Sequence, residues 1–184
     1  TEVAITRSDA PIMEAAIEHD LKIELEYGIT PPKTIVLDRS VAKKSLDVLD
    51  LGAHPDSILK YSFYHGTNRL IELIRRDSSW IKLIHLFNQR SGEISRIKKG
   101  DLAFKDFDIK LITNRSIQNR FKRENGWESF YRTFSSANGL YRVSSPVVYK
   151  NKAMLYLSHS KGPLNGVGYI IFLEQQKRWQ VSPR

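Results

Sequence analysis

The sequence predicts an α+β protein in which N-terminal and central helices pack on an antiparallel C-terminal β-meander sheet. Three observations predict this fold. Apolar residues recur at helical spacing through much of the chain, the last fifty residues alternate short β-rich runs with turn residues, and no apolar run approaches the length of a membrane span. Because the 184 residues show no sustained repeat or linker, we expect a single domain covering residues 1–184.

The first expected elements are a helix and a strand. Ser8 or Asp9 followed by Pro11 is typical of a helix start. The apolar stripe of this helix contains Met13, Ala16, Ile17 and Leu21, and its polar face carries Glu14, Glu18 and Asp20. Consecutive prolines at 31–32 exclude a continuing helix, and the run 34–37 predicts a strand. Residues 41–64 fit both a strand and a helix.

Two helices with core-facing stripes are predicted in the centre of the chain. The first carries Leu70, Ile71 and Ile74, and the second carries Trp80, Leu83, Ile84 and Phe87 after a cap at Ser78 or Ser79. Residues 93–98 and 107–113 then predict strands, and residues 116–122 predict a helical turn. A last stripe predicts an aromatic helix whose rings must be buried: Trp127, Phe130, Tyr131 and Phe134.

The last fifty residues predict four strands, at 140–144, 153–158, 167–173 and 178–181, with turn residues between them. Residues 169–173 are apolar at every position rather than alternating. We therefore expect this strand to lie at the centre of the sheet with both faces covered, and the aromatic helix is the expected cover.

The charge is unevenly distributed. The chain has 29 Lys and Arg against 20 Asp and Glu, yet the segment through Asp56 is acidic and the remainder is strongly basic. Such asymmetry indicates either that the two parts neutralise each other in the fold or that the basic part faces a polyanion. The absence of cysteine excludes disulfides, a thiol nucleophile and zinc sites that need cysteine ligands.

No segment carries a recognisable catalytic or metal-binding motif. The glycine-rich run 162–168 is followed by a strand rather than by the helix that a phosphate loop needs, and the histidines lack metal-ligand spacing. Ser158 and His159 are neighbours on a strand, so their side chains point to opposite faces. The acidic pairs Glu124 with Glu128 and Asp106 with Asp108 are interpreted as solvated charges. We assign no catalytic, cofactor or metal residues.

One basic segment suggests a binding surface, because arginines on phosphates together with aromatic rings can hold single-stranded nucleic acid. No recognised nucleic-acid-binding motif accompanies it. The hypothetical polyanion patch consists of Arg96, Lys98, Lys99, Lys105, Arg115, Arg120, Lys122 and Arg123.

The C-terminal third resembles a family of uncharacterised bacterial exported or lipoprotein-type domains. The resemblance follows the order W-x-x-F-Y from Trp127, A-x-x-Y from Ala153, L-x-G-x-G-Y from Leu164, and W-x-V from Trp179. Residues 146–149, Pro-Val-Val-Tyr, depart from the phenylalanine and asparagine of the family at this point. The family has no assigned reaction, so the resemblance implies export, and no activity can be transferred from it.

These observations together favour a binding domain over an enzyme. The sequence begins with Thr1 rather than methionine, and with the resemblance this leads us to expect export to the periplasm or cell envelope. The expected partner is another protein within an envelope assembly, without any cofactor. Two alternatives stay open, namely a polyanion-binding protein for nucleic acid or anionic lipid, and a small enzyme whose site is assembled by the fold around His65 or His159.

Overall fold

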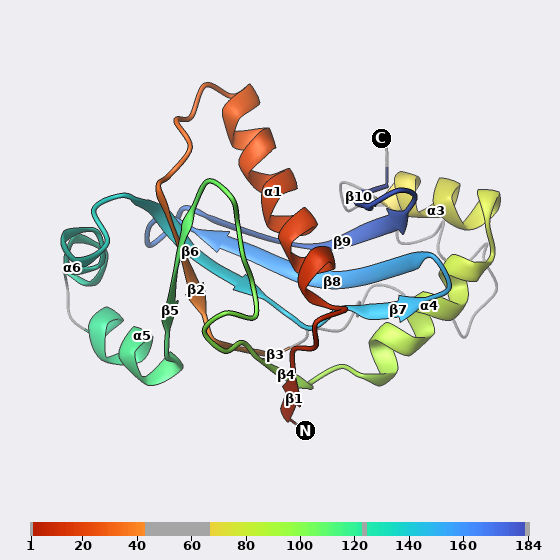
Figure 1. The fold of residues 1–184 in the computed structure, drawn as a ribbon, viewed down its shortest axis with the longest axis horizontal. Helices are drawn as coiled ribbons and strands as arrows, with labels where there is room; N and C mark the ends of the chain where they lie inside the picture. Colours follow the sequence, from red (N-terminus) through yellow and green to blue (C-terminus); the bar gives the residue numbers. More distant parts are fainter. Residues whose placement is uncertain (1, 43–66, 123–124, 183–184) are drawn as a thin grey trace.

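A computed structural model describes residues 2–42, 67–122 and 125–182 (Figure 1). The N-terminal elements are β1 (Glu2–Ala4), α1 (Ala10–Glu26), β2 (Thr34–Asp38) and β3 (Ser40–Ala42). The central elements are α3 (Thr67–Arg76), α4 (Ser79–Gln89), β4 (Ile94–Arg96), β5 (Asp108–Ile112), α5 (Asn114–Phe121) and α6 (Gly126–Thr133). The C-terminal strands are β6 (Ala137–Val143), β7 (Val147–Tyr149), β8 (Lys152–Ser160), β9 (Gly166–Gln175) and β10 (Trp179–Val181). The region whose type was left open lies mostly outside the described residues.

The main sheet has seven strands in the order β10-β9-β8-β6-β2-β5, and β7 pairs with β8 beside β6. Strands β6, β8, β9 and β10 pair antiparallel, as predicted for the C-terminal meander. The prediction of a purely antiparallel sheet is wrong, because β2 pairs in parallel with both β5 and β6. Helices α5 and α6 lie between β5 and β6 in the chain and provide the crossover that lets these strands run in the same direction.

The two central strands do not form a hairpin with each other. β4 joins a small second sheet in the order β1-β4-β3, whereas β5 forms the edge of the main sheet beside β2. Both strands therefore exist where the sequence predicts them, but their partners come from the N-terminal 42 residues. Pairing of this kind depends on contacts distant in sequence, which periodicity does not report.

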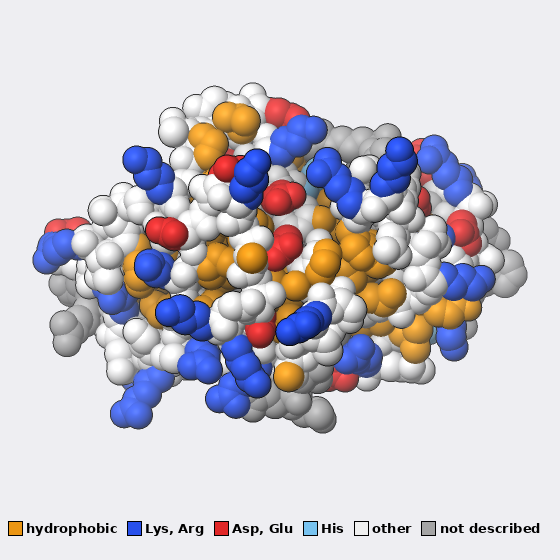
Figure 2. Space-filling model, in the orientation of Figure 1, with side chains coloured by type: hydrophobic (Ala, Val, Ile, Leu, Met, Phe, Trp, Pro, Cys, Tyr) orange, Lys and Arg blue, Asp and Glu red, His pale blue; other side chains and the backbone are white. Residues whose placement is uncertain are grey.

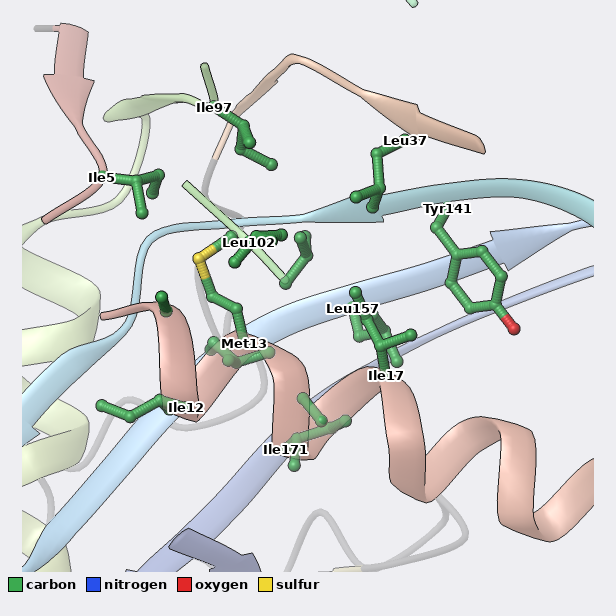
Figure 3. Packing of buried hydrophobic residues seen from close by; sticks show 14 of the residues in the cluster. Ile5, Ile12, Met13, Ile17, Leu37, Ile97, Leu102, Tyr141, Leu157 and Ile171 are labelled. Atoms are coloured by element: carbon green, nitrogen blue, oxygen red, sulfur yellow. The ribbon is translucent and has the colours of Figure 1, made fainter. Parts of the chain in front are cut away.

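Helix α1 crosses one face of the main sheet and builds the largest apolar cluster (Figure 1). Met13 and Ile17 of α1 are fully buried and contribute to one cluster with Leu157 and Ile171 of the sheet. Figure 3 shows these side chains between the helix and the strands, with the ring of Tyr141 beside them. Burial of this apolar stripe fixes α1 on the sheet, since burying each large side chain contributes roughly 1.5–3 kcal/mol.

Two separate helix pairs contact the opposite face. Helices α3 and α4 pack at one end through a cluster that includes Trp80, Phe87 and Met154. Helices α5 and α6 pack at the other end through a cluster that includes Phe130 and Leu140. Figure 1 shows the two pairs at opposite ends of the sheet.

The predicted cover of the apolar C-terminal strand is therefore corrected. The central strand is β8, which is buried at every position from Lys152 to His159, whereas β9 lies one strand further out. β9 contributes to the α1 cluster on one face, and on the other the ring of Phe172 meets that of Trp80 from α4 edge to face at 5.6 Å. The aromatic helix α6 packs instead with residues of β2, β5 and β6, where Phe130 is fully buried and Trp127 is half-buried.

The acidic and basic parts of the chain do contact each other. Glu24 of α1 pairs with Lys161, and Asp38 of β2 pairs with Arg142. Part of the opposite charge is thus neutralised within the fold. No helix among the described residues combines the length and apolar character that crossing a membrane requires.

Candidate binding cleft and the buried network behind it

Strand β8 separates two polar regions on opposite faces of the sheet. Residues alternate along a strand, so Tyr156, Ser158 and Ser160 share one face and Leu157 and His159 share the other. The first set lines an open cleft, and His159 is buried against α1. The expectation that Ser158 and His159 point apart is confirmed.

The cleft has a volume of about 900 Å³ and extends over strands of both sheets. Polar and apolar residues share its lining. These are Asp38, Ser40, Val41, Ala42, Ile94, Asn114, Arg142, Tyr156, Ser158, Ser160, Gly162, Pro163, Leu164, Gly166, Val167 and Gly168. A concave site with a few convergent polar groups in a partly apolar wall is typical of a small-ligand site.

Small residues on β8 and β9 create the hollow. Gly168 lies opposite Ser158 in the ladder, and Gly166 lies opposite Ser160. A Cβ at Gly168 would lie 2.8 Å from the Tyr156 hydroxyl oxygen, so any side chain there would collide with the neighbouring ring. The glycine-rich run thus opens space above the sheet.

An ion pair between two neighbouring strands lies at the cleft wall. Nε of Arg142 lies 3.3 Å from Oδ2 of Asp38, whose side chain is 5% exposed, whereas that of Arg142 is 33% exposed. Burial raises the pKa of Asp38 above its ordinary value, while the backbone N–H of Ser40 and the guanidinium of Arg142 oppose this effect. Arg142 makes no further hydrogen bond within the described part of the chain, so its two Nη groups are available to a ligand.

The polar lining gathers where the three parallel strands end. Asp38 is the last residue of β2, Asn114 follows β5 by two residues, and Arg142 is the next-to-last residue of β6. The carboxyl ends of parallel strands are the usual location of ligand sites in sheets with crossover helices. α5 also begins here, with the Thr113 hydroxyl accepting a hydrogen bond from the backbone N–H of Ser116 at 3.2 Å.

A buried polar network lies on the other face of the same strands, beneath α1. Asp20 and Glu24, one helical turn apart, both face the Nδ1 atom of His159, at 3.0 and 3.2 Å. The Tyr141 and Tyr169 hydroxyls donate to Asp20, and the Asn138 amide and the Lys161 ammonium donate to Glu24. The prediction that Asp20 lies on the polar face of α1 is wrong, because its side chain is buried against the sheet. The hydrogen-bond donors around it compensate the cost of burying its charge.

The centre of the network, formed by Asp20, His159 and Tyr141, is closed to solvent. His159 is 2% exposed, its ring stacks on Tyr141 with centroids 3.9 Å apart, and its Nε2 atom has no hydrogen-bond partner among the described residues. Gly139, with φ of 147°, covers this atom so closely that a Cβ would lie 2.6 Å from Nε2. Burial raises the pKa of Tyr141, and the charges of Asp20 and Glu24 add to this effect.

The network could in principle hold a cation, since one nitrogen and two carboxylate oxygens lie within 4.8 Å of one another. Each carboxylate oxygen already accepts a hydrogen bond, however, and the Lys161 ammonium supplies positive charge at Glu24. The arrangement therefore stabilises the packing of α1 against the sheet without requiring a metal. The fold assembles this set from residues that sequence spacing could not connect.

The hypothetical polyanion patch is divided by the fold. Arg96, Lys98, Lys99 and Lys105 are exposed on β4 and the following loop, whereas Arg115 and Lys122 are exposed at α5. Arg120 instead donates to the backbone oxygen of Ser129 at 2.7 Å and to the Thr133 hydroxyl at 2.8 Å, so it joins α5 to α6. Arg123 lies outside the described residues. Figure 2 shows Lys and Arg spread over one face with acidic side chains between them.

Other candidates from the sequence play no part in either region. His85 is exposed, His54 and His65 lie outside the described residues, and the exposed Asp106 and Asp108 border β5. Glu124 is also outside the described residues, while Glu128 pairs with Arg132 on the surface of α6.

Sequence reasoning missed Asp38, Arg142 and the pair Asp20 and Glu24. The last pair carries one usable signal: the four-residue spacing continues the apolar stripe of α1 from Ile17, which places both carboxylates toward the sheet. No family model, curated protein or solved structure matches this chain.

Proposed function

We propose that the protein is a ligand-binding domain without catalytic activity, whose ligand occupies the cleft over the strands of both sheets. Ser158 carries this proposal. It is only 6% exposed and lines the cleft, yet its hydroxyl makes no hydrogen bond within the described part of the chain. This hydroxyl is not one of the fully buried polar atoms that lack a partner; it lies open to the cleft, so a ligand that reaches the sheet can hydrogen-bond to it directly.

The chemistry of the lining favours binding over catalysis. Among the described residues that line the cleft there is no histidine, lysine or glutamate, and the carboxylate of Asp38 is engaged by Arg142. Ser158 therefore has no base within the described lining to activate it. The carboxylate and histidine set that could transfer protons lies on the other face of β8, sealed beneath α1.

The resemblance of the C-terminal third supports a further part of this proposal, namely that the domain works in the bacterial cell envelope. Expression of the full-length natural chain followed by cell fractionation tests this part. Recovery with the envelope or periplasmic fraction agrees with it, and recovery only with the cytoplasm contradicts it.

Binding at the cleft is tested by protein-observed NMR with a diverse set of small organic fragments. We expect shifts that cluster on the backbone amides of cleft residues, such as Ser158 and Gly168. The variant Gly168→Leu places a side chain in the hollow and should abolish these shifts. Glu18→Leu is the matched control, since it adds the same side chain at an exposed position of α1 that does not line the cleft.

Two results would count against the proposal. Fragments that bind elsewhere but never at cleft amides would remove the cleft as the binding site. Turnover of a bound fragment that depends on Ser158 would replace binding by catalysis.

A further inference from the structure

The geometry points to an amphiphilic oxyanion as the ligand of the cleft: a carboxylate or phosphate that carries an apolar chain. This inference rests on the proposed function and names the chemical class of its ligand. Three features of the lining support it, namely the orientation of Arg142, the hydrogen-bond donors around it and the exposed apolar side chains.

Arg142 provides a fixed positive charge at the cleft wall. Its Nε atom is held by Asp38, which orients the guanidinium plane without occupying the two Nη atoms. A guanidinium presented in this way matches the paired oxygens of a carboxylate or phosphate, and such charge-assisted bonds are among the strongest in proteins. Asp38 thus acts as a positioning residue for Arg142.

Neutral donors surround this charge. Ser158, a residue that is 6% exposed, lines the same cleft and lies opposite Arg142 in the pairing of β6 with β8, so its hydroxyl can donate to an oxygen that Arg142 attracts. Asn114 also lines the cleft and starts α5, where the positive end of the helix dipole favours an anion. Two independent elements therefore favour negative charge in the same hollow.

Three exposed apolar side chains also line the cleft. Ile94, Leu164 and Val167 line the cleft with 41%, 101% and 54% of their surface exposed. They come from β4, the loop after β8 and the start of β9, and they are among the few large apolar side chains that the described residues leave exposed. Exposed apolar side chains that meet at one cavity indicate the apolar part of a ligand.

Isothermal titration calorimetry with three eight-carbon probes tests the inference: octanoate, octyl phosphate and octan-1-ol. The chain is the same in each probe, so the difference between them isolates the oxyanion. We expect each anionic probe to bind at least about tenfold more tightly than the alcohol, as a charge-assisted hydrogen bond allows. The relative affinity of octanoate and octyl phosphate then identifies the head group.

Variants assign the effect to named residues. Arg142→Gln should remove the preference for the anionic probes, and the double variant D38N/R142Q gives the same result without leaving Asp38 unpaired. Arg132→Gln on the surface of α6 is the matched control and should leave the affinities unchanged. Leu164→Ser should weaken all three probes together, because it removes apolar contact and no charge.

The outcomes separate this inference from the proposed function. Equal affinity for the alcohol and the anions would overturn the inference that the ligand is an oxyanion, while the proposal that the cleft binds a ligand would stand. Anion binding that survives in D38N/R142Q would place the oxyanion elsewhere and also overturn the inference. Absence of binding by every probe, with uncharged fragments still shifting cleft amides in the NMR experiment, would reject the ligand class alone.

Discussion

Ser158 and His159 are consecutive residues of β8, yet Ser158 opens into the cleft and His159 is sealed beneath α1. One strand therefore forms the wall of two polar regions with different roles. On the cleft face Ser158 and the ion pair of Asp38 with Arg142 line an open hollow, whereas on the α1 face each carboxylate oxygen is satisfied internally. Substitutions on the two faces should consequently have different effects, on binding in the first case and on stability in the second.

Gly139 is the first position at which stability should respond. Gly139→Ala places a Cβ 2.5 Å from the Ser160 backbone oxygen and 2.6 Å from Nε2 of His159, at a positive φ that side chains rarely adopt. We expect a loss of about 3 kcal/mol or more in the free energy of unfolding, measured by urea denaturation.

Gly92→Ala is the matched control for this prediction. Gly92 also has a positive φ, of 80°, but its Cβ would meet no atom within 4 Å. Its loss should be limited to the backbone strain, about 1 kcal/mol. Equal losses in the two variants would show that the close approach to His159 and Ser160 contributes nothing.

Asp20 should be the most sensitive charged residue of α1. Asp20→Ala leaves Tyr141, Tyr169 and His159 without a shared acceptor in a buried region. We expect a loss of about 3–5 kcal/mol in unfolding free energy, as for one member of a buried ion pair. Glu18→Ala, at an exposed position of the same helix, should change it by about 0.5 kcal/mol or less. If Asp20→Ala lowered the free energy of unfolding no more than Glu18→Ala does, the network would not contribute to stability.

The same residue shows how far the sequence predicts this molecule. Helices α1, α3 and α4 and the late strands were predicted because apolar periodicity records which side of an element is covered. The sequence predicts Asp20 on the exposed face of α1, because a carboxylate is expected at the surface unless the residues that hydrogen-bond to it are known. Those partners, such as Tyr141 and His159, lie more than a hundred positions away.

The parallel part of the sheet escaped prediction for a related reason. The short run 34–37 was predicted as a strand, but its neighbours β5 and β6 are set by crossovers and by packing on α5 and α6. The cleft depends on that arrangement, since Asp38, Asn114 and Arg142 come together only when β2, β5 and β6 run in the same direction. The sequence therefore shows the elements, and tertiary pairing creates the site.

The pair of Asp77 and Lys152 predicts a pH dependence of stability. Nζ of Lys152, whose side chain is 6% exposed, lies 2.6 Å from Oδ2 of Asp77 and 5.4 Å from the centroid of the Trp80 ring. The hydrogen bond from Lys152 lowers the pKa of Asp77 below its ordinary value. Because the folded protein holds this carboxylate ionised to lower pH than the unfolded chain does, its contribution to stability is present above about pH 4 and is lost on further acidification.

Asp77→Asn tests this dependence. At pH 7 it should cost about 1–3 kcal/mol, because the buried ammonium loses its charged partner. The difference between wild type and variant should shrink as the pH falls below about 4 in thermal unfolding followed by circular dichroism. Lys152→Met should reduce the pH-dependent difference without removing it, because hydrogen bonds from Ser79 also lower the pKa of Asp77. A difference that stays constant from pH 7 to pH 3 would contradict the assignment.

Adding a metal ion and measuring the Tm shows whether Asp20, Glu24 and His159 form a purely structural network or a cation site. Nδ1 of His159 faces two carboxylates that can only accept hydrogen bonds, so it carries a hydrogen and cannot at the same time ligate a metal. We therefore expect Zn²⁺ and Mn²⁺ to leave the Tm of the wild-type protein unchanged. Lys161→Met removes the ammonium from Glu24 but leaves the hydrogen on Nδ1, so Zn²⁺ should leave the Tm of that variant unchanged as well, since only a metal that binds the folded state would raise it. A rise in the wild type that disappears in His159→Gln would instead establish a metal centre beneath α1.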